Sequence, residues 1–172
     1  MNKISVILAL IITLAGCRPK DQCDVGYALI YSHARQVCKE NHNFELIGFG
    51  GSFYGGDIKM LAANFHAYSE LSLDEARKAL IKGAEEFLNQ INSDTKSIPY
   101  LNHHPFSAKD LDYGIGFIDE KKHDFVGNNY IAHAFILNGK VYYDTLNEQT
   151  GHLQDFYEET YEEALQKAQI SK

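Results

Sequence analysis

Apolar side chains recur every three or four residues in three segments of the chain, a spacing that predicts three helices with one apolar face each. The segments are 25–39, 72–91 and 160–168. The last two open with Ser-Leu-Asp-Glu at 72–75 and Thr-Tyr-Glu-Glu at 160–163. Both are capping boxes, in which a hydroxyl and a carboxylate bond the free backbone amides of the first turn. Each helix should therefore press its apolar face against a sheet.

Alternation of apolar and polar residues predicts six β-strands, at 44–50, 57–68, 111–119, 130–137, 140–146 and 152–157. Asn138-Gly139 lies between two of them and predicts a tight hairpin, because both residues of a type I′ turn need positive φ. Gly114 and Gly116 lie on the side of their strand opposite its apolar residues. This position predicts a close approach of another group, or a bend.

The order of elements is helix, two strands, helix, four strands, helix. Strands joined by hairpins pair in antiparallel fashion, so the pattern predicts an α+β fold in which the helices pack on one face of an antiparallel sheet. The segment 98–110, with two prolines, is expected to be a loop. The chain shows no internal repeat and no linker, so 25–172 should form a single domain.

An apolar run at 4–14 follows Lys3 and ends in Leu-Ala-Gly-Cys at 14–17. The run is too short to span about 30 Å of hydrocarbon, so a removable signal peptide at 1–16 is expected. The four residues resemble the bacterial lipobox. That resemblance implies that Cys17 is the first mature residue and carries a covalent lipid of several acyl chains, with 17–24 as the lipidated tether. The alternative is an ordinary secretory signal with a cysteine at its end.

Arg18, rather than Asp, follows the cysteine, and by the same resemblance this implies the periplasmic face of the outer membrane if the cell is Gram-negative. The membrane is then a partner through the N-terminal lipid.

The formal net charge is −7, which argues against nucleic acid as a partner. No cofactor is expected apart from the covalent lipid on Cys17.

Cys23 and Cys38 are the other two cysteines. In an exported protein they are expected to form a disulfide, because the oxidising compartment favours one. The alternative is two separate free thiols.

The sequence contains eight histidines, which raises the possibility of a metal site. His103 and His104 lie in the predicted loop and His133 on a strand, and a small metal-dependent hydrolase using these three is the alternative to a binding protein. The usual zinc-ligand spacings are missing from the sequence. Asp144 and His133 are expected to be cross-strand neighbours around the Asn-Gly turn. No sequence motif marks a nucleophile that would form a catalytic triad with them.

Tyrosines gather in the C-terminal half of the chain, and on alternating strands some of them must face away from the helices. A half-exposed aromatic sheet face would suit a protein partner of the cell envelope, since tyrosine is favoured at interfaces. The candidates are Tyr113, Tyr130, Tyr142 and Tyr143. The alternative is that these rings only pack at the rim of the core.

Six stretches carry a further likeness: 48–51, 57–61, 73–77, 85–93, 99–101 and 105–106. They resemble an uncharacterised family of exported bacterial proteins with no established activity, across roughly residues 25–168. The resemblance implies export and one domain, and it transfers no catalytic residue. The sequence therefore predicts an exported lipoprotein of the cell envelope, a binding or accessory protein more readily than an enzyme.

Overall fold

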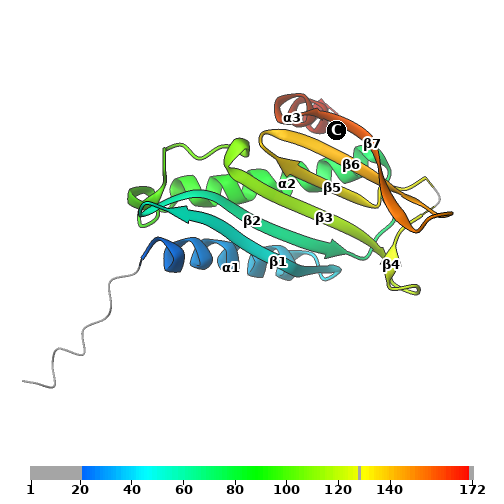
Figure 1. Ribbon diagram of the computed structural model, residues 1–172, viewed down its shortest axis with the longest axis horizontal. Coiled ribbons are helices and arrows are strands. Elements are labelled where there is room, and N and C mark those ends of the chain that lie inside the picture. The colour runs from blue at the N-terminus through cyan, green and yellow to red at the C-terminus, as the bar shows by residue number, and fades with distance from the viewer. Residues whose placement is uncertain (1–20, 128, 171–172) are drawn as a thin grey trace, which may run out of the picture.

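The computed structural model describes residues 21–127 and 129–170. The predicted signal peptide, Cys17 and the predicted tether up to residue 20 lie outside this part of the chain. The helices are α1 (Gln22–Glu40), α2 (Leu73–Ser93) and α3 (Tyr161–Ile170) (Figure 1). The strands are β1 (Phe44–Tyr54), β2 (Asp57–Ala67), β3 (Leu111–Asp119), β4 (Asp124–Phe125), β5 (His133–Leu137), β6 (Lys140–Asn147) and β7 (His152–Thr160). Two short 3₁₀ helices, η2 (Ile98–Tyr100) and η3 (Ala108–Asp110), occupy the predicted loop.

The strands form one sheet in the order β1-β2-β3-β5-β6-β7, and β4 pairs with β3. The predicted α+β class is confirmed. One pairing differs from the expected antiparallel pattern, because β2 and β3 are parallel. The connection between them contains α2, which carries the chain back to the end of the sheet where β2 began, and a crossover of this kind joins parallel strands.

All three helices pack on one face of the sheet, and Figure 1 shows the sheet from the opposite side. Helix α1 lies against β1 and β2, α2 against β3 and β5, and α3 against β6 and β7. The core between these layers is closed by large rings, including the fully buried Phe65 of β2, Phe87 of α2 and Phe117 of β3. The face toward the viewer, which we call the open face, has no helix over it in the described part of the chain.

Local sequence signals account for the ends of the elements. The predicted capping box at Ser72 is present, with the Ser72 amide donating to Glu75 (2.9 Å). Thr160 and Glu163 form the same arrangement before α3. Helix α1 begins at Gln22, three residues earlier than expected, because Asp21 and Asp24 form a capping box that the sequence analysis missed. The folded domain therefore starts closer to Cys17 than predicted.

The two remaining cysteines lie at opposite ends of α1, and both are free thiols in the structure. At ~1.5 Å of rise per residue, Cys23 and Cys38 are about 22 Å apart along the helix axis. A disulfide joins Cα atoms no more than about 7 Å apart. The continuous helix thus argues against the predicted bridge, which would require α1 to unwind.

Candidate functional site

Two buried glycines of β3, Gly114 and Gly116, are covered on the open face by side chains of the neighbouring strands. Asn64 and His66 of β2 flank them on one side and His133 of β5 on the other. A Cβ atom added at Gly114 would lie 2.3 Å from Asn64 Oδ1 and 3.3 Å from His133 Nε2. Only glycine therefore leaves these two polar atoms room to converge over β3. The close approach predicted for the glycines is confirmed, and we call these five residues the glycine cluster.

His133 is held in the glycine cluster by Asp144. The two residues are cross-strand partners on β5 and β6, as predicted from the Asn138-Gly139 turn, whose residues have φ of 52° and 76°. His133 Nδ1 lies 3.4 Å from Asp144 Oδ2, a long hydrogen bond in which the ring nitrogen donates. This bond directs Nε2 toward Gly114, over which the side-chain oxygen of Asn64 also lies.

His66 forms the other imidazole of the glycine cluster. Burial lowers the pKa of His66 below its ordinary value; Glu45 acts in the opposite direction, and nearby His133 lowers the pKa further. Burial and the second histidine both favour the neutral form of the His66 ring. At neutral pH His66 is therefore a hydrogen-bonding group rather than a cation.

Stacked rings extend from the glycine cluster across β5 and β6. The His133 and Phe135 rings are 4.8 Å apart at an interplanar angle of 20°, and the Phe135 and Tyr142 rings are 5.0 Å apart at 17°. Phe135 and Tyr142 are cross-strand partners, so the stack follows directly from strand register. We call His133, Phe135 and Tyr142 the ring row. It presents a flat, half-buried surface.

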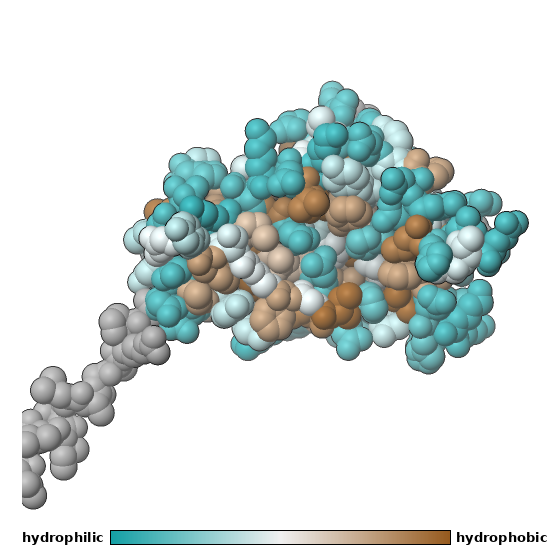
Figure 2. All heavy atoms as spheres, in the orientation of Figure 1, coloured by the Kyte–Doolittle hydropathy of each residue, from teal (hydrophilic) through white to brown (hydrophobic). Residues whose placement is uncertain are grey.

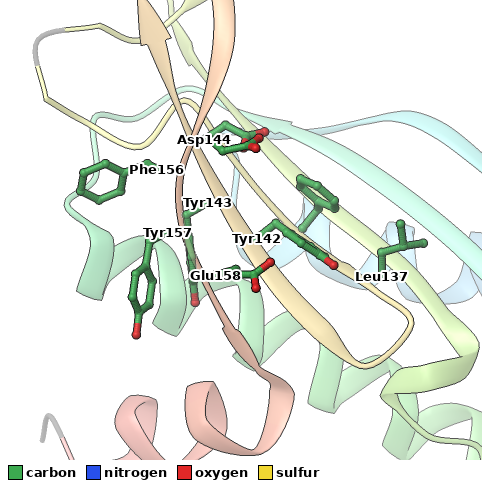
Figure 3. A pocket seen from close by; sticks show the side chains of 9 residues that line it. Leu137, Tyr142, Tyr143, Asp144, Phe156, Tyr157 and Glu158 are labelled. Carbon is green, nitrogen blue, oxygen red and sulfur yellow. The ribbon is translucent and has the colours of Figure 1, made fainter.

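A shallow pocket of about 640 Å³ adjoins the ring row over β5, β6 and β7. Its lining includes Leu137, Tyr142 and three acids, Asp144, Asp155 and Glu158. Figure 3 shows Tyr142 and Glu158 side by side on β6 and β7, with Asp144 further along β6. Asp144 and Asp155 are directly opposite each other across the strands, an arrangement in which like charges repel. Lys140 lies 3.3 Å from Glu158 and offsets one of these charges.

The four predicted tyrosines do not share a surface. Tyr113 and Tyr143 are buried on the helix face, where Tyr113 shares a hydrogen bond with His33 (3.1 Å) and Tyr143 donates one to Glu159 (2.8 Å). Tyr130 is half-buried against the core. The prediction of a common partner surface is therefore wrong for Tyr113 and Tyr143. Tyr142 alone of the four lies in the ring row, because neighbouring residues of a strand face opposite sides.

The three histidines predicted as a metal site are not brought together. His103 Nε2 lies 2.9 Å from Asp110, and His104 Nε2 lies 3.2 Å from the carbonyl of Asn92, both in the loop before β3. His133 pairs with Gly116, about 16 Å further along β3 at ~3.3 Å per residue. Within residues 21–127 and 129–170, no three His, Cys, Asp or Glu side chains are grouped to hold a metal ion. The proposed ligand set is wrong as a single site.

Sequence analysis missed Asn64, His66 and Phe135. Alternation in the segment 57–68 places Asn64 and His66 opposite the apolar side chains of β2, which was the signal that could have found them. Figure 2 shows the result: hydrophobic residues lie over the middle of the open face, broken by single hydrophilic ones and surrounded by a hydrophilic rim.

Comparisons with protein-family models, curated proteins and solved structures give no match for this chain. The resemblance to a family of exported bacterial proteins therefore stays a prediction. No helix in the described residues is long and apolar enough to cross a membrane.

Proposed function

We propose that this protein is an exported lipoprotein, held to the membrane by a lipid on Cys17, that binds a partner of the cell envelope through its open face without catalysing a reaction. The observation that carries the binding role is the ring row beside an acidic pocket, on the sheet face that no helix of the described residues covers. Partly exposed aromatic surface of this kind is characteristic of interaction sites. The location is supported by the lipobox-like 14–17 stretch and by the short distance from Cys17 to α1.

The charges around the ring row favour a positively charged partner. Asp112, Asp144, Asp155 and Glu158 all belong to this side of β3, β6 and β7, and in the described part of the chain Lys140 forms an ion pair with one of them, Glu158. A guanidinium or ammonium group can stack on an aromatic ring while it pairs with a carboxylate. Tyr142, opposite Glu158 and two residues from Asp144, offers both contacts to a lysine or arginine side chain of the partner.

Crosslinking in intact cells, followed by capture of the protein and mass spectrometry, tests the binding role. Tyr142→Ala and Asp155→Asn should each lower the yield of a stoichiometric envelope partner by about tenfold, the effect of losing ~1.4 kcal/mol of binding free energy. Glu162→Gln, at an exposed acid of α3, is the matched control and should leave the yield unchanged. Equal yields from all three variants would remove the open face from the binding site.

Cell fractionation tests the anchor separately. Replacing Cys17 by Ser removes the thiol that would receive the lipid, so the variant should move from the membrane fraction to the soluble fraction. Retention of the Cys17→Ser variant in the membrane fraction would show that a different feature holds the protein there.

A further inference from the structure

A second aromatic surface lies on the side of the molecule where α1 meets β1. The Phe49 ring is 5.9 Å from Tyr27 and 4.8 Å from Tyr31, and Tyr27 also contacts Phe53 at 5.4 Å. Despite these contacts Tyr27, Tyr31 and Phe49 remain 38%, 47% and 46% exposed. Tyr54, at the tip of the β1–β2 hairpin, is 75% exposed. We call Tyr27, Tyr31 and Phe49 the aromatic patch; Tyr54 follows Phe53 on β1 and faces the opposite side of the strand at the same end of the hairpin.

The aromatic patch lies at the end of the domain where the chain enters it. Asp21 caps α1, and Tyr27 is about 9 Å further along the helix axis at ~1.5 Å per residue. Phe53 contacts Tyr27, so the hairpin tip with Tyr54 is at the same end of the molecule. In Figure 1 the first turns of α1 and the tip of the β1–β2 hairpin lie together at the left of the domain.

The predicted anchor is only four residues from Asp21. A chain of four residues spans at most about 14 Å when fully extended. The tether thus holds the entry end of the domain next to the lipid headgroups, and the open pocket on β5, β6 and β7 lies toward the opposite edge of the sheet.

Tyrosine and phenylalanine suit this position because their rings are favoured at the boundary between headgroups and hydrocarbon. Lys59 Nζ lies 5.1 Å from the centre of the Tyr54 ring, so the hairpin tip pairs an aromatic ring with a lysine that can reach lipid phosphates. The aromatic patch consists of rings rather than charged side chains, so it can enter this region without burying an ion.

We propose that the aromatic patch docks on the lipid surface beside the anchor and fixes the orientation of the domain on the membrane, with the pocket edge of the sheet directed away from it. This inference rests on the proposed lipid anchor at Cys17.

The chain contains no tryptophan, so one substitution gives a clean fluorescent reporter. The lipidated Phe49→Trp variant is reconstituted into phosphatidylcholine vesicles with and without brominated acyl chains, which quench tryptophan by contact. Brominated lipid should reduce the emission of the residue-49 reporter by about twofold or more, as expected for a ring at the interface. Tyr142→Trp, in the ring row, is the matched control and should be unaffected. Tyr54→Trp provides a second reporter at a side chain with little packing to disturb.

The outcomes separate docking from anchoring. Vesicle-bound protein whose reporters at 49 and 54 are not quenched would overturn the docking while the anchor stands. Equal quenching at 142 would overturn the orientation. A blue shift at 49 that does not depend on brominated lipid would indicate burial against a second copy of the chain and would overturn the lipid assignment. Failure to sediment with vesicles would overturn the anchor, and the docking with it.

Discussion

His33 of α1 is a buried histidine at the junction of three elements. Its ring stacks on Phe87 of α2 at 4.5 Å and 15°, and Nε2 shares a 3.1 Å hydrogen bond with the Tyr113 hydroxyl of β3. Burial lowers the pKa of His33 from its ordinary 6.5 to about 4, and the charge of Glu40 acts in the opposite direction. The folded protein therefore keeps this ring neutral, while the unfolded chain binds a proton below pH 6.5.

Folding stability should consequently fall as the pH is lowered between about 6.5 and 4. Above this range His33 is neutral in both states, and below it the ring is protonated in both, so the loss is complete near pH 4. The shift corresponds to a loss of about 3 kcal/mol. Urea unfolding of the wild type and of His33→Gln across this pH range measures this loss. The difference between their free energies of unfolding should shrink as the pH falls. A difference that does not change with pH would contradict the buried neutral ring.

Glu159 of β7 is the centre of a buried ionic network. It accepts hydrogen bonds from Arg77 of α2 (2.6 Å), Tyr143 of β6 (2.8 Å) and Lys167 of α3 (2.5 Å), and Arg77 also pairs with Asp74. Burial alone would raise the pKa of Glu159, but the hydrogen bonds from Arg77, Lys167 and Tyr143 bring it below its ordinary value. The network ties the two helices to the end of the sheet.

Glu159→Gln should destabilise the fold by about 3–5 kcal/mol, because it leaves the Arg77 charge buried without its main partner. Glu158→Gln, one residue earlier, is the matched control: its side chain is 60% exposed and pairs only with Lys140 at the surface. That change should alter stability by no more than about 1 kcal/mol. Thermal unfolding compares the two, and equal losses would show that the network contributes no more than a surface pair.

At the residue scale, the sequence could predict that Tyr142 and Tyr143 face opposite sides, but not which side the helices cover. His133 and Asp144 could be paired because one short turn sets their register. Asn64 and His66 lie beside the same glycines because of the register in which β2 pairs with β3. That register depends on the long connection through α2, which short sequence patterns do not determine. Residues joined by a hairpin were thus predictable, and those joined through α2 were not.

At the scale of elements, helix starts and the Asn138-Gly139 hairpin were predictable because each depends on a few neighbouring residues. The parallel pairing of β2 with β3 was not, since strand alternation is the same in both directions. The predicted disulfide shows the same limit. The predicted helix at 25–39 already separated the two cysteines, but the missed capping box at Asp21 left Cys23 outside it, free to fold back on Cys38.

The α1 helix makes a direct prediction about these thiols. In a Cys17→Ser variant, which retains only Cys23 and Cys38, alkylation without reductant should add two labels to the intact mass. A protein that accepts no label would contain the bridge and would show that α1 is not continuous in solution.

At the scale of the whole molecule, the fold separates two tasks. The helix face supplies the core and the ionic network, while the open face carries the glycine cluster, the ring row and the acidic pocket. The entry of the chain at α1 places the proposed anchor at the β1 edge, far in strand order from the pocket at β6 and β7. The proposed anchor would therefore leave the open face accessible.

Site-specific photocrosslinking in intact cells tests this account most directly. A photoreactive residue in place of Tyr142 samples the open face, and one in place of Gln166 samples an exposed position on α3. We expect a discrete adduct with an envelope partner from position 142 and none from position 166. Equal adducts from both positions, or an adduct from 166 alone, would contradict binding through the open face.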